Sequence, residues 1–118
     1  MQDIVMFIKE VDSPQLISKM EENDNLVIID VREMHEINRG TIQGAIPMPM
    51  ASIPVRLDEI PKDKEVVFIC RSGARSGQVC MFLGQHGYEH VINLRGGMIG
   101  WVRSGNQPVL PEHISSTY

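Results

Sequence analysis

One cysteine of this 118-residue chain stands where residue types and spacing favour a reactive thiolate. Cys70 follows an apolar run and opens the segment Cys-Arg-Ser-Gly-Ala-Arg-Ser, residues 70–76. Its glycine allows a tight backbone turn, and Arg71 and Arg75 place two cations near the sulfur. A loop that runs into a helix N-terminus also presents unpaired backbone N–H groups, which bind anions. The segment therefore predicts an exposed, nucleophilic Cys70 thiolate in an anion-binding loop.

The chemistry of such a loop follows from the charge of the sulfur. A free cysteine has a pKa of about 8.5, and a helix N-terminus with nearby cations lowers it by several units. A thiolate attacks a sulfur–sulfur bond without a general base. The alternative interpretation is a small buried side chain at a strand end, which is the commoner role of a lone cysteine. The coincidence of cysteine, glycine, two arginines and a helix start in residues 70–76 favours a functional loop.

The elements that must position this loop are strands alternating with helices. Apolar runs typical of buried strands occupy residues 26–30, 65–69 and 91–94, and an irregular strand is expected at 45–50. Ser13 and Pro14 are expected to open a helix as N-cap and first helical residue. Further helices are expected at residues 33–39, 75–86 and 98–103, with a short one before Pro61. This order predicts an α/β domain with a mainly parallel central sheet.

Composition limits the classes of partner. Eleven basic against fifteen acidic residues give a net charge of −4, which argues against a general nucleic-acid binder and against adhesion to anionic membranes. The longest uncharged stretch, residues 41–55, contains three prolines and is shorter than the ~20 residues of a membrane span. The start of the chain does not resemble a secretory signal, so a cytoplasmic protein is expected. We expect one domain, residues 1–108, with a flexible C-terminal tail, residues 109–118.

Other residues that could do chemistry are expected to be structural. Cys80 falls inside the helix after the loop, too far to reach the Cys70 sulfur, and is expected to be a buried thiol. His86 and His90 have metal-like spacing, but a glycine breaks the helix between them, so no metal site is expected. Arg32 and Glu36 lie one helical turn apart and are expected to form an ion pair that braces a strand end.

Three segments, in order, resemble signatures of the rhodanese family. Residues 70–75 resemble its active-site loop. The first signature is matched by Asp30-Val31-Arg32 and then by Glu36, Gly40, Ile42, Gly44 and Ala45. The closing signature is matched by Leu94, Gly96, Gly97, Trp101, Gly105 and Pro108. The matches cover residues 26–108, and Thr41 departs from the pattern because the family usually has histidine there.

The resemblance implies a rhodanese-like three-layer fold, with helices on both faces of the sheet, and a single-domain sulfurtransferase without cofactor or metal. It assigns catalysis to Cys70 and substrate binding to the loop that follows, namely Arg71, Ser72, Gly73, Ala74 and Arg75. In the family reaction the cysteine takes the outer sulfur of a donor such as thiosulfate and becomes a persulfide. A nucleophile, cyanide or a thiol, then takes that sulfur. Within the loop, Arg71 is expected to attract the donor and Arg75 to brace the backbone by hydrogen bonds.

The loop length separates this chain from related phosphatases. Cys70 to Arg75 is a Cys-x4-Arg loop, whereas dual-specificity and arsenate-handling phosphatases use a wider Cys-x5-Arg loop that suits a phosphate. Two further alternatives remain: a sulfur-relay module that passes persulfide sulfur between carrier proteins, and an inactive scaffold, whose relatives typically lose the cysteine. The donor, the acceptor and the oligomeric state are left open by the residues.

Overall fold

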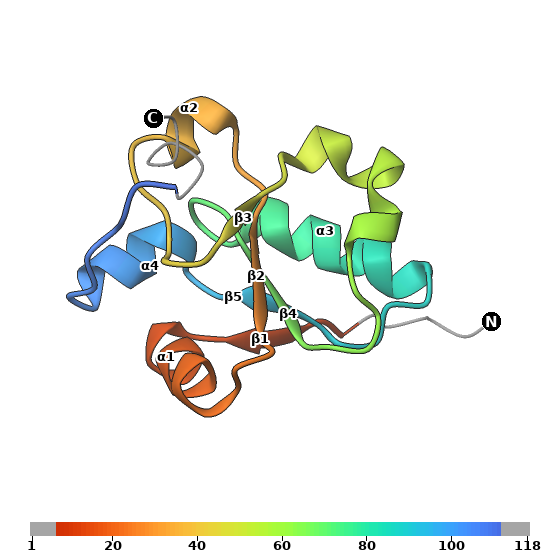
Figure 1. The fold of residues 1–118 in the computed structure, drawn as a ribbon, viewed down its shortest axis with the longest axis horizontal. Helices are drawn as coiled ribbons and strands as arrows, with labels where there is room; N and C mark the ends of the chain where they lie inside the picture. The colour runs from red at the N-terminus through yellow and green to blue at the C-terminus, as the bar shows by residue number, and fades with distance from the viewer. Residues whose placement is uncertain (1–6, 112–118) are drawn as a thin grey trace.

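The computed structural model describes residues 7–111, and its centre is a five-stranded parallel sheet (Figure 1). All four strand pairs are parallel. The strands lie in the order β1 (Lys9–Val11), β5 (Val91–Leu94), β4 (Val66–Ile69), β2 (Val27–Asp30) and β3 (Ile46–Pro47). The parallel sheet expected from the alternation of apolar runs and helices is confirmed, and β4, the strand before Cys70, lies in its middle.

Helices cover both faces of the sheet, as expected (Figure 1). On one face lie α3 (Ala74–Gln85) and two 3-10 helices, η1 (Met50–Val55) and η2 (Leu57–Glu59). On the other face lie α1 (Ser13–Glu22) and α4 (Gly97–Arg103). A short helix, α2 (Met34–Ile37), follows β2 at the carboxyl end of the strands. The molecule is therefore a three-layer α/β domain.

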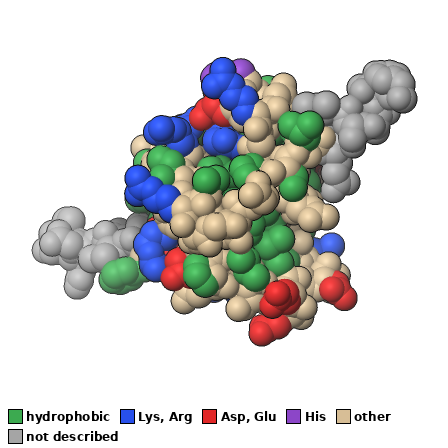
Figure 2. All heavy atoms as spheres, turned by 90° about the vertical axis from the view of Figure 1, so that its left-hand side faces the viewer, with side chains coloured by type: hydrophobic (Ala, Val, Ile, Leu, Met, Phe, Trp, Pro, Cys, Tyr) green, Lys and Arg blue, Asp and Glu red, His purple; other side chains and the backbone are tan. Residues whose placement is uncertain are grey.

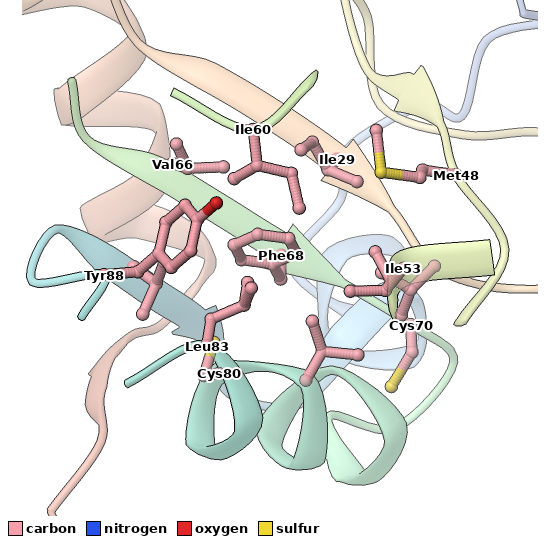
Figure 3. Packing of buried hydrophobic residues seen from close by; sticks show 13 residues of the cluster. Ile29, Met48, Ile53, Ile60, Val66, Phe68, Cys70, Cys80, Leu83 and Tyr88 are labelled. Atoms are coloured by element: carbon pink, nitrogen blue, oxygen red, sulfur yellow. The ribbon is translucent and has the colours of Figure 1, made fainter. Parts of the chain in front are cut away.

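The alternation of side chains along β4 divides the core into two clusters. Phe68 and Cys70 face α3, whereas Val67 and Ile69 face the layer of α1 and α4. Phe68 is fully buried at the centre of the α3 cluster (Figure 3), and burying a side chain of this kind contributes about 1.5–3 kcal/mol. This packing fixes the end of β4, and with it the position from which the Cys70 side chain leaves the strand.

Two details of the elements differ from the expectations. The sequence does not predict the strand β1. Only one of its three residues, Val11, is buried, so it lacks the apolar run that marks β2, β4 and β5. The N-cap of α1 is Asp12 rather than Ser13. Its side chain accepts a hydrogen bond from the Gln15 N–H at 2.9 Å, and the Gln15 side chain accepts one from the Asp12 N–H at 2.8 Å. This reciprocal capping satisfies two backbone donors and outcompetes serine as the cap.

After α4 the chain runs back to the segment between α2 and β3. Val109 forms an antiparallel bridge with Thr41, each backbone N–H donating to the other residue's carbonyl, at 2.8 and 2.7 Å. The rest of the tail expected from residue 109 onward, residues 112–118, lies outside the described residues. In the described part of the chain, no helix has the length and apolar character that crossing a bilayer requires.

Candidate functional site

Cys70 lies at the carboxyl end of β4, where the backbone turns sharply into α3 (Figure 3). Gly73 makes this turn. Its φ of 101° is in the left-handed region, and it is the N-cap residue of α3. The Gly73 N–H donates to the Cys70 Sγ at 3.0 Å. The run of residues 70–76 therefore forms the predicted loop, with the sulfur close to the first turn of the helix.

The Cys70 side chain is buried, with 0% of its surface exposed, so the expectation of an exposed thiolate is wrong. The loop curls over the sulfur instead of presenting it to solvent. Besides the Gly73 N–H, the Ser76 Oγ lies 3.3 Å from the sulfur on the first turn of α3. The exposed parts of the loop are its rim residues Arg71, Ser72 and Ala74.

The pKa of the Cys70 thiol lies below its ordinary value. Burial is the largest influence and raises the pKa, but hydrogen bonds to the sulfur outweigh it. They come from the Ser76 hydroxyl and from the backbone N–H groups of Ser76, Gly73 and Ser72. The predicted lowering of the Cys70 pKa is confirmed. The largest influences that lower the Cys70 pKa are the hydrogen bonds of the loop, and the charge of Arg75 also acts on the sulfur.

The start of α4 anchors the carbonyl side of the loop. The Met98 N–H donates to the Cys70 carbonyl at 2.9 Å, and the Ile99 N–H donates to the Arg71 carbonyl at 3.0 Å. Gly97 makes this close approach feasible, because a Cβ there would lie 2.5 Å from both carbonyl oxygens. With these carbonyls bonded to α4, the groups that face the sulfur are hydrogen-bond donors, namely backbone N–H groups and the Ser76 hydroxyl.

Arg75 braces the loop against α2, as expected. Its guanidinium donates to both carboxylate oxygens of Glu36 at 2.9 Å. This hydrogen-bonded pair lowers the pKa of Glu36 to about 2. The ion pair expected between Arg32 and Glu36 is wrong, because Arg32 turns inward to Asp30 while Glu36 faces Arg75. The spacing of Arg32 and Glu36 suggested a local pair, but each has a better-placed partner.

Glu36→Gln is expected to flatten the dependence of stability on pH in acid. A carboxyl whose pKa falls on folding contributes stability above its unfolded pKa, near 4.5, and loses that contribution as the pH falls toward 2. Urea unfolding at neutral pH and at about pH 3 measures the change in each variant. Glu59→Gln is the control, since Glu59 pairs with Arg56 on the surface and its replacement alters the profile less. An unchanged acid profile in Glu36→Gln would contradict the assignment.

A buried ionic cluster braces the end of β2. Asp30 is fully buried and accepts hydrogen bonds from the Arg32 Nε at 3.0 Å and from the Arg32 Nη2 at 2.8 Å. Arg32 also donates to the Gly40 carbonyl at 2.7 Å, and the Thr41 hydroxyl donates to Asp30 at 2.7 Å. Thr41, which stands where the family usually has histidine, therefore supplies a hydrogen bond to the buried carboxylate.

A hollow of about 490 Å³ lies beside the loop, over α2 and α4. Its wall combines apolar side chains of α4, including Met98, Ile99 and Val102, with four arginines, Arg32, Arg39, Arg71 and Arg103, and with one acidic residue, Glu36, which is paired with Arg75. Figure 2 looks onto the side of the molecule that carries α2 and α4, where Lys and Arg side chains gather around hydrophobic ones. Arg39, Arg71 and Arg103 are exposed and make no ion pair with another described residue. This hollow suits an anion although the chain as a whole is acidic.

The remaining candidates are outside this site. Cys80 is buried, as expected, and its burial raises the pKa of the thiol to about 12, so it stays protonated. His86 contacts the Phe82 carbonyl through its Nδ1 at 2.8 Å. Among residues 7–111, no group of three or more His, Cys, Asp or Glu side chains is placed to hold a metal ion.

Sequence reasoning does not single out two polar residues of the site. Ser76, on the first turn of α3, contacts the Cys70 sulfur, and Asn93 contacts Ser76. Asn93 is nearly fully buried in β5, beside Ser76. The signal that could have found it is a single polar residue within the apolar run Val-Ile-Asn-Leu, because a buried amide needs hydrogen-bond partners.

Comparisons with known proteins agree with this geometry. The family model of the rhodanese-like domain matches residues 13–104. A sulfurtransferase of Allochromatium vinosum is 47% identical over 105 residues, covering 89% of this chain and 98% of that protein. The thiosulfate sulfurtransferase GlpE of Glaesserella parasuis is 34% identical, covering 78% of this chain and 85% of that protein.

A solved structure extends the agreement to the fold. The crystal structure of a rhodanese-like domain protein from Staphylococcus aureus superposes with a TM-score of 0.79 at 30% identity, covering 88% of this chain and 99% of that one. The family match, residues 13–104, includes the strands β2 to β5, the cysteine loop and α4. The chain therefore belongs to the rhodanese-like sulfurtransferase family.

Proposed function

We propose that the protein transfers the outer sulfur of thiosulfate to a thiophilic acceptor through a persulfide on Cys70. The observation that carries this proposal is the environment of the sulfur: a Cys70 pKa below its ordinary value, with backbone N–H groups and a hydroxyl directed at the sulfur. The relative named as a thiosulfate sulfurtransferase supports thiosulfate as the donor. A reducing compartment such as the cytoplasm would keep both cysteines as free thiols.

The first step loads the enzyme. The Cys70 thiolate attacks the outer sulfur of thiosulfate, a new sulfur–sulfur bond forms, and the old one breaks with its electron pair on the departing sulfite. The negative charge then rests on the outer sulfur of the persulfide. The N–H groups of Ser72 and Gly73, which lower the pKa of the Cys70 thiol, would stabilise that charge if the outer sulfur stays beside the loop.

The second step returns the thiolate. Cyanide or a thiolate attacks the outer sulfur, and the sulfur–sulfur bond breaks with its electron pair returning to the Cys70 Sγ. The product is thiocyanate or a new persulfide. No oxidant is consumed over the cycle, and no general base is required because the nucleophile is already ionised at each step.

The arginines of the hollow attract the donor. Arg71 is adjacent to Cys70 in the chain, and Arg39 and Arg103 lie on the same hollow. Thiosulfate carries two negative charges, and unpaired arginines near a site raise the local concentration of such an anion. Arg75 is held by Glu36 and so keeps the loop in place.

Intact-mass spectrometry tests the persulfide. A brief incubation with thiosulfate is expected to add the mass of one sulfur atom, peptide mapping is expected to locate it on residue 70, and cyanide is expected to remove it. An addition on Cys80 instead would overturn the mechanism. The absence of any addition, with the Cys70 thiol still titratable, would exclude thiosulfate as the donor.

A second candidate function is favoured by the size of the hollow. At about 490 Å³ the hollow is within the range of sites that hold ligands much larger than thiosulfate. A sulfur-relay module would use it to receive an acidic, partly apolar segment of a carrier protein. Poor turnover of thiosulfate together with fast loading from a protein persulfide would favour the relay over the enzyme.

A further inference from the structure

A chain of polar groups connects the Cys70 sulfur with the edge strand β1, and the transfer steps do not use it. The Ser76 Oγ lies 3.3 Å from the Cys70 Sγ and makes a short hydrogen bond with the Asn93 Oδ1. The Asn93 Nδ2 lies 2.8 Å from the Glu10 Oε2. Glu10 and Asn93 are register partners on adjacent strands, which places both side chains on the α3 face of the sheet. Ser76 and Asn93 are 0% and 2% exposed.

The partners of Asn93 decide which way its amide points. The Glu10 carboxylate accepts a hydrogen bond from the Asn93 Nδ2 at 2.8 Å, and the Gly73 carbonyl accepts a second one at 3.1 Å. Both partners are acceptors, so the end of the amide that faces them is the NH₂ group. The Asn93 Oδ1 is consequently the end that faces Ser76, and it can only accept a hydrogen bond.

Ser76 therefore has two acceptors for one proton. Its hydroxyl donates either to the Asn93 Oδ1 or to the Cys70 sulfur, but not to both at full strength. When Cys70 is a thiolate, the negative sulfur is the stronger acceptor. When the sulfur is neutral, as a thiol or as the inner sulfur of a persulfide, the amide oxygen is the stronger one. The preferred position of the proton thus depends on the charge of the sulfur.

We propose that Ser76 and Asn93 form a hydrogen-bond switch, in which the Ser76 hydroxyl donates to the Cys70 sulfur while that sulfur is charged and to Asn93 while it is neutral. Glu10 is a positioning residue in this switch, because it holds the Asn93 amide in the orientation that accepts from Ser76. The role during turnover rests on the proposed persulfide, whose formation moves the charge from the Sγ to the outer sulfur. The buried Ser76 hydroxyl therefore keeps a hydrogen-bond acceptor in both charge states of the Cys70 sulfur.

Two substitutions are expected to act in opposite directions. Ser76→Ala removes the donor to the thiolate and is expected to raise the pKa of Cys70 by about one. Asn93→Leu keeps a side chain of similar size but removes the competing acceptor. The Ser76 proton is then free for the sulfur, and the pKa of Cys70 is expected to fall by a similar amount. The measurement is the pH dependence of the thiolate's ultraviolet absorbance and of the rate of alkylation by iodoacetamide, in a Cys80→Ala background.

A double variant shows whether Asn93 acts through Ser76. In Ser76→Ala with Asn93→Leu, the second substitution is expected to change the pKa of Cys70 little, because the proton for which Asn93 competes is absent. Ser76→Thr restores a hydroxyl and is expected to return the pKa toward the wild-type value. A general loosening of the core would not produce this pattern.

Glu10 offers a matched pair of surface variants that do not disturb the core. Glu10→Gln removes the charge and keeps an acceptor for the Asn93 amide, whereas Glu10→Leu removes both. The pKa of Cys70 is expected to be lower in Glu10→Leu than in Glu10→Gln, since only the former leaves the Gly73 carbonyl as the single acceptor that orients the Asn93 amide. The other ionisable groups around the sulfur, Arg75 and Cys80, influence it electrostatically. Their effects cancel in the comparison, because Arg75 is unchanged and residue 80 is alanine in every variant.

The proposal is overturned by either of two results. One is that Asn93→Leu raises the pKa of Cys70 or leaves it unchanged. If Asn93→Leu does not fold, the proposal is overturned instead by equal Cys70 pKa values in Glu10→Gln and Glu10→Leu. The other is an equal effect of Asn93→Leu with and without the Ser76 hydroxyl. These titrations need no sulfur transfer, so a failure of the proposed function, seen by mass spectrometry, is distinguished from a failure of the switch.

Discussion

Cys70→Ala is expected to lower thiosulfate-to-cyanide sulfur transfer by at least about a thousandfold, because the variant lacks the atom that carries the sulfur between the two steps. No other described thiol can replace it. Cys80, the second cysteine of the chain, is buried and its thiol has a pKa of about 12. The measurement is the initial rate of thiocyanate formation, with circular dichroism to verify that the variant is folded.

Cys80→Ala is the matched control for this experiment. It removes a thiol of the same helix-covered core but leaves the loop of residues 70–76 intact, so its transfer rate is expected to stay within a few-fold of wild type. Substantial thiocyanate formation by the Cys70 variant would show that the sulfur is transferred elsewhere. Loss of activity in both variants would point to damage of the core rather than to the nucleophile.

Asp30→Ala is expected to destabilise the protein by about 3–5 kcal/mol, the usual cost of removing one partner of a buried ion pair. Asp30 is 0% exposed and Arg32 is 7% exposed, so the guanidinium would keep its charge in a buried position, with the Gly40 carbonyl as its one remaining hydrogen-bond acceptor among residues 7–111. Chemical denaturation monitored by circular dichroism measures the difference in the free energy of unfolding.

Thr41 allows the contributions within this cluster to be separated. Thr41→Val removes the hydroxyl that donates to Asp30 while keeping the hydrogen bonds between Asp30 and Arg32, and it is expected to cost about 1 kcal/mol. Thr41→His tests whether the residue usual in the family satisfies the same carboxylate. A loss of less than about 1 kcal/mol in Asp30→Ala would show that the ion pair is not important for stability.

The parts of the site that depend on neighbouring residues were predictable. The cysteine, the glycine with a positive φ and the start of α3 lie within residues 70–76, so their types specify the loop before any tertiary contact is known. The strands β2, β4 and β5 were predictable for a similar reason, because buried parallel strands are marked by continuous apolar runs. The edge strand β1 lacks such a run and was missed.

The contacts made between distant segments were not predictable in the same way. Glu36 pairs with Arg75 across 39 positions of the chain, and spacing along a helix suggested Arg32 instead. Asn93 reaches Ser76 across 17 positions. The burial of Cys70 likewise depends on how the loop closes over the sulfur. Local patterns identify the residues that do chemistry, whereas tertiary packing chooses the partners that tune them.

The contact between the cysteine loop and α4 fixes the orientation of the peptide group between Arg71 and Ser72. A trans peptide group carries its C=O and N–H on opposite sides, so the Ile99 N–H that holds the Arg71 carbonyl also turns the Ser72 N–H toward Cys70. If α4 moved away, that peptide could flip and present a carbonyl oxygen to the sulfur, which would repel both the thiolate and any anionic donor. A helix that begins 27 positions after Cys70 thus orients one N–H group of the loop toward the sulfur, and it does so through its backbone.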